Sequence, residues 1–420
     1  MKFVHAADLH LDSPLLSLQR RDARQVERMR RATRDAFTRL VDLCVEEAAA
    51  FLLIAGDLYD HDAPNMQVAV FLRRELRRLQ AKGIRCVCIK GNHDAQNKIT
   101  SALALPDNTR VLGERAPETV IFDDLPVRVA VHGRSFPPGP VPDNLAASYP
   151  APLAGACNIG LLHTSLAGSG EHDVYAPCAL EDLTSRGYDY WALGHIHRRA
   201  VVSRDPLVVF PGNLQGRHAR ESGAKGCYVV EVDGAGRPAA ASFAALDVVR
   251  WLQADVDLAG EAGEAGLAAA LRAALEQAWR EADGRAAAVR VVLAGATPLH
   301  DVTLRRPDRV RQTVLELADE IAGDDMWIEK IVNHTAPPAG VTAPGEEAQD
   351  LIGIMHELAA NAAVLGPQLA RELEPLRTRL PGDLKEHPAL KVLHDPALVG
   401  DLFARLKPRL ATRLGGEEDA

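Results

Sequence analysis

The sequence predicts an α/β protein of layered architecture. Short apolar runs that are typical of buried strands alternate with amphipathic stretches that are typical of helices, and polar residues follow many of the runs directly. The chain has 420 residues, which is more than one hydrophobic core usually serves, so we expect two or three domains.

The first predicted domain covers residues 1–245. Helical periodicity extends over 24–50 and 65–82, and the second stretch ends at Gly83, a common C-cap residue. The strand-like runs occupy 3–6, 51–55, 84–89, 127–132, 159–162, 190–193, 207–210 and 226–232. Helices and strands in this order predict functional loops at the strand ends.

A second predicted domain covers residues 248–334 and reads as a small β-α-β-α-β module. Its strands are expected at 251–258, 287–293 and 326–332, and its helices at 265–282 and 310–321. Residues 335–348 have the Pro- and Gly-rich composition of a linker. Residues 349–414 are predicted to form helices broken at prolines, and 415–420 a disordered tail.

The composition is that of an ordinary soluble protein, with 47% hydrophobic and 25% charged residues. We find no signal-peptide pattern and no apolar run long enough to span a membrane, so we expect a cytoplasmic protein without membrane contact. The six cysteines form no CxxC pair, which predicts reduced thiols in the core.

Charge is distributed unevenly. A net charge of −9 does not favour a general nucleic-acid binder. Arginines nevertheless cluster within 20–39 and again within 73–78. On helices such runs are usually solvated faces, and the alternative is a surface that follows a phosphate backbone beside a site.

Five short motifs, each after an apolar run, supply side chains that bind metals. They are Asp8-Leu9-His10, Gly56-Asp57-Leu58-Tyr59-Asp60, Gly91-Asn92-His93-Asp94, His163, and Gly194-His195-Ile196-His197. Each motif alone occurs by chance, and a lone histidine on an apolar strand is usually structural. The five together predict one site for two divalent cations.

The predicted roles follow from residue type and spacing. Asp57 is the natural bridge between two ions, because a carboxylate has two oxygens. The spacing of Asp8 and His10 lets both reach one ion, and one loop could give His195 and His197 to different ions. Asn92 adds an oxygen and His163 a nitrogen. Mixed nitrogen and oxygen ligands suit Mn²⁺, Fe²⁺ or Zn²⁺.

The remaining polar residues of the motifs have other expected roles. Strand-like geometry would turn His93 away from the ion that Asn92 binds, so His93 could donate a proton to a leaving oxygen, with Asp94 orienting its ring. In the turn-rich loop after residue 210, Arg217 and His218 could contact a phosphate, although a solvated loop is the simpler interpretation. Four further histidines read as structural or surface residues: His5, His61, His132 and His172.

With these motifs, the chain resembles the calcineurin-like metallophosphoesterase superfamily, and within it the Mre11/SbcD DNA repair nucleases of the YhaO-type branch. The segment His5 to Leu15 is similar to the start of that branch, and so is Pro211 to His218 with Glu221, Gly223 and Lys225 to Tyr228. The resemblance is strong over about 1–245, looser over 248–334 and weak beyond 345.

The resemblance implies a four-layer sandwich of two mixed sheets flanked by helices, followed by a capping domain beside the DNA site. It implies that one ion binds Asp8, His10, Asp57 and His197, and that the other binds Asp57, Asn92, His163 and His195. It also implies His93 as the catalytic histidine and Mn²⁺ as the ion. At position 60 this chain has Asp60, where archaeal and eukaryotic Mre11 proteins have histidine, so we expect Asp60 to orient the site and assign it no catalytic role.

The leading hypothesis is therefore a two-metal DNA nuclease, an exonuclease of DNA repair, that hydrolyses phosphodiesters with a metal-activated water. The resemblance further implies an SMC-like ATPase partner, with 349–414 as a docking segment, and a homodimer through helix 24–50, although that helix could equally pack on its own sheet. The first alternative is a small-molecule phosphodiesterase or phosphatase with the same metal core. The second is a metal-free scaffold, which the complete ligand set argues against.

Overall fold

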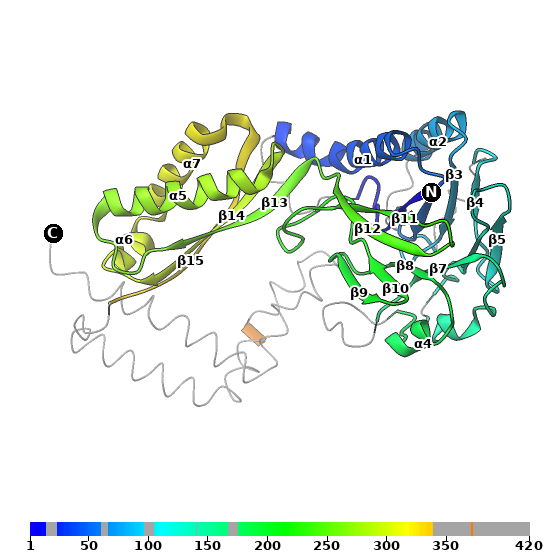
Figure 1. Cartoon of the computed structure of the whole chain (residues 1–420). Helices are drawn as coiled ribbons and strands as arrows, with labels where there is room; N and C mark the ends of the chain where they lie inside the picture. Colours follow the sequence, from blue (N-terminus) through cyan, green and yellow to red (C-terminus); the bar gives the residue numbers. More distant parts are fainter. Residues whose placement is uncertain are drawn as a thin grey trace. The chain divides into compact units, whose positions relative to one another are not determined.

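Two six-stranded sheets and one three-stranded sheet organise the described part of the chain (Figure 1). The structure is a computed structural model, and it describes residues 1–13, 23–59, 66–95, 105–139, 141–166, 175–338 and 371–372. The first two sheets are mixed, as expected for this α/β class, and they carry the predicted ligands at their strand ends.

The first sheet has the strand order β12-β11-β1-β2-β3-β4. The strands β1 to β4 run parallel, whereas β11 is antiparallel to both of its neighbours, β1 and β12. Their bounds are β1 (Lys2–Ala6), β2 (Phe51–Ala55), β3 (Arg85–Ile89), β4 (Thr109–Val111), β11 (Gly226–Val232) and β12 (Pro238–Ala245). Because β2 is covered on both faces, all its residues are buried and its sequence is an unbroken apolar run.

Two helices cover the outer face of this sheet, α1 (Ala23–Glu46) and α2 (Met66–Ala81). Phe37 and Leu40 of α1 are buried in one cluster with Leu52 of β2. The apolar side of α1 therefore packs on its own sheet, which is one of the two roles expected for that helix. The second helix ends as predicted, with Gly83 at φ +70°.

The second sheet has the order β5-β6-β7-β8-β10-β9. Its strands are β5 (Glu118–Phe122), β6 (Val129–Gly133), β7 (Cys157–His163), β8 (Tyr190–Gly194), β9 (Ala200–Arg204) and β10 (Leu207–Phe210). Its outer face packs against the short helices η2 (Leu145–Ser148) and α4 (Leu180–Thr184), with Tyr149 and Trp191 in the same buried cluster. The inner faces of the two sheets meet in a common core, where Phe3 and Phe51 stack with ring centroids 5.0 Å apart.

The third sheet has the order β13-β14-β15, with β13 (Val249–Asp257), β14 (Ala286–Ala296) and β15 (Met326–Ala336). Between them lie α5 (Gly263–Ala282), α6 (His300–Arg305) and α7 (Pro307–Ala322). The chain divides into two compact units, and the division passes through this sheet. The first unit comprises Met1–Gln253, Ala278–Arg290 and Ala322–Glu329, so Trp251 and Trp327 share a buried cluster with Met29 of α1.

Several elements differ from the sequence prediction. The strands β4, β5, β9 and β12 and the short helix α6 were not expected, because their runs are short or rich in Ala and polar residues. The strand β15 continues to Ala336, so the predicted linker at 335–348 begins inside a strand. The predicted helical segment 349–414 lies outside the described residues, apart from 371–372, which are helical, and so does the tail 415–420.

The remaining general expectations concern thiols and membranes. All six cysteines are buried free thiols, as predicted. Among the described residues, the structure contains no helix with the length and apolar character needed to cross a bilayer.

Candidate metal centre

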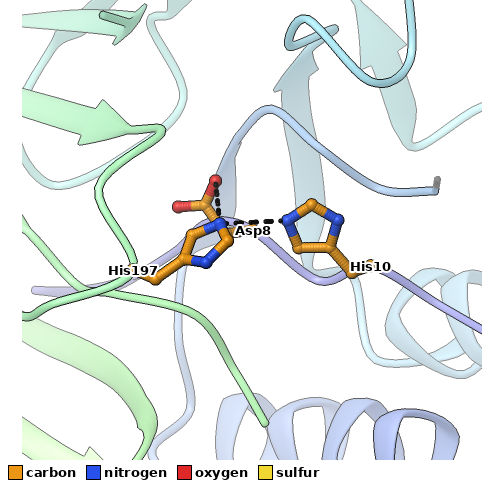
Figure 2. Close-up of side chains that lie close together, drawn as sticks. All are labelled: Asp8, His10 and His197. Carbon is orange, nitrogen blue, oxygen red and sulfur yellow. Dashed lines mark hydrogen bonds and ion pairs between the residues drawn. The ribbon is translucent and has the colours of Figure 1, made fainter. Parts of the chain in front are cut away.

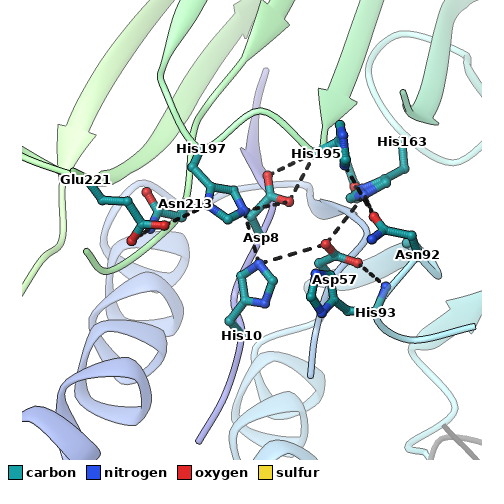
Figure 3. Close-up of polar contacts among 12 residues, drawn as sticks. Asp8, His10, Asp57, Asn92, His93, His163, His195, His197, Asn213 and Glu221 are labelled. Carbon is teal, nitrogen blue, oxygen red and sulfur yellow. Dashed lines mark hydrogen bonds and ion pairs between the residues drawn. The ribbon is translucent and has the colours of Figure 1, made fainter. Parts of the chain in front are cut away.

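Five strand ends bring the predicted ligands together (Figure 3). Asp8 follows β1, Asp57 follows β2, and His163 is the last residue of β7. Asn92 follows β3 and His195 follows β8, so both large sheets contribute. Neighbouring parallel strands place their carboxyl ends at one edge of a sheet, and ligands collect there. All seven predicted ligands lie in one cluster: Asp8, His10, Asp57, Asn92, His163, His195 and His197.

One half of the cluster is the His163 half-site, formed by Asn92, His163 and His195. The Asn92 Oδ1 atom lies 2.9 Å from His163 Nε2 and 3.2 Å from His195 Nδ1. The other ring nitrogen of His163 donates to the Ala55 carbonyl over 2.8 Å, which leaves Nε2 as the atom with a lone pair. Two imidazole nitrogens and an amide oxygen therefore converge on one point.

The other half is the His197 half-site, formed by Asp8, His10 and His197 (Figure 2). His10 Nε2 and His197 Nε2 are 3.2 Å apart, and His197 Nε2 is 4.0 Å from Asp8 Oδ1. Both oxygens of Asp8 also accept a hydrogen bond from the backbone amide of His195, each over 3.1 Å. Asp8 thus ties this half-site to the loop that carries both histidines of the GHIH motif.

Asp57 lies between the two half-sites. Its Oδ2 atom is 3.5 Å from His163 Nε2 and 3.8 Å from His10 Nε2. Its Oδ1 atom accepts a hydrogen bond from the backbone amide of His93 over 3.0 Å. A carboxylate held in this position faces ligands of both groups, as a bridging residue requires.

The backbone of the site is unusual at the ligands themselves. Four of the seven predicted ligands have positive φ: Asp8 at 51°, His10 at 43°, Asp57 at 54° and His195 at 98°. Such conformations are costly for side chains other than glycine and concentrate at functional sites. They are maintained here by hydrogen bonds such as Asp8 N to Gly56 O, at 3.1 Å.

Glycines allow the strands to approach closely around His163. A Cβ added to Gly56 would lie 2.5 Å from His163 Nδ1, and one added to Gly194 would lie 2.9 Å from the same atom. A Cβ on Gly91 would collide with the Asp57 carboxylate. The glycines of the GD, GNHD and GHIH motifs therefore make room for the ligands of the neighbouring strands.

The electrostatics of the cluster fit divalent cations. Burial, together with the adjacent Asp57 carboxylate, raises the pKa of Asp8 well above its ordinary value. Burial lowers the pKa of His163 to about 3, so its ring is neutral at physiological pH. Two neighbouring buried carboxylates beside the neutral His163 ring attract positive charge, and this mixed nitrogen and oxygen set suits a borderline transition metal.

His93 and Asp94 belong to a turn, which differs from the strand-like geometry expected for this segment. The His93 ring lies edge-on to the His10 ring, with centroids 5.0 Å apart, so it does reach the site. The Asp94 carboxylate is hydrogen-bonded to the backbone. The two Asp94 oxygens accept hydrogen bonds from the amides of Leu58, Tyr59 and Gly91 at 2.9, 2.9 and 3.2 Å.

Through these backbone amides Asp94 fixes the loop that carries Asp57. Its expected role in orienting His93 stays a prediction. Burial and the nearby Asp57 charge raise the pKa of Asp94 to about 7, although the backbone hydrogen bonds oppose this shift.

Glu221 contacts a predicted ligand, although no sequence motif assigned it a role in the site. It is buried, and its Oε1 accepts a hydrogen bond from His197 Nδ1 over 2.7 Å. Burial raises the pKa of Glu221, but the His197 hydrogen bond and the Arg217 charge outweigh this and hold it well below the ordinary range. Glu221 lies in a turn-rich loop, where no hydrophobic periodicity marks a residue as important. A role in the site is indicated only by its contacts, which include Asn213.

The two predicted substrate contacts, Arg217 and His218, lie beside this carboxylate. Arg217 Nη2 is 3.3 Å from Glu221 Oε1, and His218 Nε2 is 3.6 Å from the same atom. The His218 side chain is 49% exposed, whereas that of Arg217 is 15% exposed, so His218 is much more open to solvent than Arg217.

The histidines predicted to be structural divide into two groups. His5 and His132 are buried and hydrogen-bonded away from the ligands, His5 to Tyr190 and His132 to Thr119 and Asn158. Burial lowers the pKa of His5 to about 3. His61, His172 and Asp60 lie outside the described residues.

Comparison with known proteins gives family matches to two separate stretches of the sequence. Residues 1–199 match the family described as calcineurin-like phosphoesterase, and residues 251–336 match the one described as metallophosphoesterase YhaO, middle domain. The uncharacterized metallophosphoesterase YhaO of Bacillus subtilis (strain 168) is 33% identical over 349 residues, which cover 81% of this chain and 84% of that protein.

More distant similarity extends to two archaeal proteins, both named DNA double-strand break repair protein Mre11. The protein of Methanopyrus kandleri is 26% identical over 273 residues, covering 56% of this chain and 55% of its own length. That of Sulfurisphaera tokodaii is 26% identical over 220 residues, covering 49% of this chain and 51% of its own length. The match thus spans about half of each of these relatives.

Proposed function

The chain belongs to the calcineurin-like phosphoesterase family and is therefore a metal-dependent hydrolase, and we propose that its substrate is DNA. The main structural support for hydrolysis is the position of Asp57, whose Oδ2 lies within 3.8 Å of a ring nitrogen from each half-site. The similarity to Mre11 proteins of M. kandleri and S. tokodaii supports DNA as the substrate.

We propose that one ion is held by Asp8, His10, Asp57 and His197, and the other by Asp57, Asn92, His163 and His195. Mn²⁺ is the proposed ion, since nitrogen and oxygen ligands without thiolate suit it. When bound, such a pair of ions neutralises phosphate charge and generates a nucleophile from water.

His93 has the position of the proton donor in this proposal. Its ring lies against that of His10, while its backbone amide is fixed by Asp57. From there the ring can give a proton to the oxygen that leaves the phosphorus. We expect His93→Asn to retain both metal ions and to lower hydrolysis by about a hundredfold or more. Loss of metal in that variant would instead make His93 a structural residue.

A small phosphodiester is the second candidate, and the arginine clusters favour it. Many of these arginines are paired with acids: Arg28 with Asp325, Arg31 with Glu27, Arg34 with Asp12, and Arg78 with Glu75 and Asp42. Such pairing is what a solvated helical face shows, and it leaves less positive charge for a phosphate backbone.

A direct assay separates the two candidates. End-labelled double- and single-stranded DNA and bis-p-nitrophenyl phosphate are incubated with the full chain and Mn²⁺, with EDTA and Asp57→Asn as controls. We expect metal-dependent cleavage of both DNA and the small ester. Cleavage of only the small ester, with or without an ATPase partner, would move the assignment to a small-molecule phosphodiesterase.

We also propose an SMC-like ATPase as partner, which is tested by co-purification with the full chain. The segment expected to dock it, 349–414, lies almost entirely outside the described residues. Deletion of the residues after 345 should abolish co-purification and spare hydrolysis, and unchanged co-purification would refute this docking site.

A further inference from the structure

We propose that Glu221 is a positioning residue that holds His197 ready to bind metal, and that its loop couples the His197 half-site to strand β13. We call residues 211–225 the anchor loop. The proposal deepens the metal-dependent function proposed above and rests on it. Its observations are the contacts of the anchor loop on its two sides, all within the first compact unit.

On one side, the anchor loop holds the metal-binding histidine (Figure 3). Glu221 Oε1 accepts from His197 Nδ1 over 2.7 Å. Glu221 Oε2 accepts from Asn213 Nδ2 over 2.9 Å and from the Arg217 amide over 2.7 Å. Both oxygens are thus occupied, and the carboxylate has a fixed orientation.

This orientation selects the tautomer of His197. A neutral imidazole carries one proton, and the nitrogen that carries it cannot bind a metal. Because ionised Glu221 only accepts, the His197 proton resides on Nδ1 and the lone pair on Nε2, the atom that faces His10 and Asp8. A histidine oriented by a carboxylate in this way binds metal more tightly.

Arg217 is consistent with the same tautomer. Its Nη2 atom lies 3.3 Å from both His197 Nδ1 and Glu221 Oε1. A guanidinium can only donate, so with the proton on Nδ1 it donates to the carboxylate. His197 Nδ1 and Arg217 Nη2 then both donate to Glu221 Oε1, and Arg217 stabilises the negative charge of the carboxylate that orients His197.

On the other side, the anchor loop is attached to the start of β13. Trp251 Nε1 donates to the Gly216 carbonyl over 2.9 Å, and the amide of Gly223 donates to the Trp251 carbonyl over 2.8 Å. Gln215 Oε1 accepts from the Val248 amide over 2.7 Å, while its Nε2 donates to the Val249 carbonyl over 2.6 Å. A Cβ on Gly216 would lie 2.9 Å from Trp251 Cδ1, so the contact is tight.

The His163 half-site has no such attachment among these contacts. His163 is oriented by the Ala55 carbonyl of β2, inside the first sheet. A disturbance of the anchor loop should therefore weaken one ion and leave the other, which distinguishes positioning from a general loss of structure.

Glu221→Gln is the primary test. In the variant, the amide oxygen still accepts from Asn213 and the Arg217 amide, so the amide nitrogen faces His197 Nδ1 and donates to it. The proton moves to Nε2, and metal binding at that atom is opposed. We expect one of two Mn²⁺ equivalents to bind about 10- to 100-fold more weakly, by calorimetry on the metal-free full chain. Glu231→Gln, an exposed carboxylate on β11, is the matched control.

Two further measurements keep the test decisive. Long-range ¹⁵N–¹H spectra of the metal-free protein should show the His197 proton on Nδ1 in the wild type and on Nε2 in Glu221→Gln. Trp251→Phe removes the bond to Gly216 together with part of a buried ring, and it should weaken the same Mn²⁺ equivalent by less than about tenfold.

Normal affinity for both ions together with an unchanged tautomer in Glu221→Gln would overturn the proposal. If that variant does not fold, Trp251→Phe decides, and unchanged binding of both ions would count against the coupling. A wild-type chain that binds no Mn²⁺ would contradict the proposed function instead, while the tautomer of His197 would still decide the role of Glu221.

Discussion

The two halves of the metal centre are held in place by different kinds of structure. His163 ends a fully buried strand, and its ring is fixed by the Ala55 carbonyl of the neighbouring sheet. His197 lies in a loop after β8, and its ring is fixed by Glu221 of another loop. The difference shows that one half-site depends on the packing of two sheets, and the other on an irregular segment attached to β13.

Asp57→Asn should have the largest effect, because Asp57 Oδ2 faces both halves. An amide cannot bridge two cations as a carboxylate does, so we expect hydrolysis to fall by about a thousandfold or more. Bis-p-nitrophenyl phosphate turnover with Mn²⁺ measures it, and Asp124→Asn, an exposed carboxylate, is the control. Near-normal turnover of Asp57→Asn would show that Asp57 is not a shared bridge and that the two half-sites act independently.

Two glycine substitutions separate the halves. Gly194→Ala places a methyl group against the Ala55 carbonyl and His163, whereas Gly216→Ala places one against Trp251 and the Glu221 carbonyl. Each should cost about 1–3 kcal/mol of unfolding free energy through overpacking. Calorimetric Mn²⁺ titration should show the His163 half-site weakened in the first variant and only the His197 half-site weakened in the second. Weaker binding of the same Mn²⁺ ion in both variants would show that the two half-sites are not held in place separately.

Acid should loosen the sheet that supports the His163 half-site. His5 donates from Nε2 to the Leu193 carbonyl, next to Gly194, and burial lowers its pKa to about 3. Unfolded His5 binds a proton below about pH 6.5, but folded His5 does not until about pH 3. Its contribution to stability is therefore present above pH 6.5 and is lost as the pH falls.

Urea unfolding of the metal-free protein between pH 7 and 4.5 measures this contribution. Relative to His5→Gln, the wild type should lose about 1 kcal/mol of unfolding free energy for each pH unit below 6.5. If the unfolding free energy of both proteins changed equally with pH, the loss of stability could not be attributed to His5. Asp94, whose pKa is raised to about 7, acts in the opposite direction in both proteins and cancels in the difference.

The smallest effect is expected at His218, in the same loop as Glu221. Its side chain is 49% exposed and lies 3.6 Å from Glu221 Oε1, so it contributes little to the carboxylate's orientation. His218→Ala should change unfolding free energy by no more than about 0.5 kcal/mol and leave Mn²⁺ binding unchanged. If His218→Ala clearly lost one Mn²⁺ ion, His218 would share the positioning role proposed for Glu221.

The same contrast explains what could be predicted from sequence. Ligands such as Asp57 and His163 adjoin apolar runs, and periodicity finds those runs because burial requires them. The strand β12 was missed, since its alanines carry no strong strand pattern. Glu221 was missed for a different reason: its role depends on a hydrogen bond to His197, and loop contacts follow no periodic rule. The backbone contacts of Asp94 could not be predicted either, because the turn geometry that creates them cannot be read from residue order.

The long sequence separation within the site has a consequence for biosynthesis. His10 and His197 contact each other although they are 187 residues apart, and the Trp251 bond to Gly216 comes later still in the chain. Because contacts of high sequence separation form only when a domain folds as a unit, a nascent chain on the ribosome completes the support of the His197 half-site only after the start of β13 has emerged. Metal loading should therefore follow folding, and incomplete translation products should lack the paired centre.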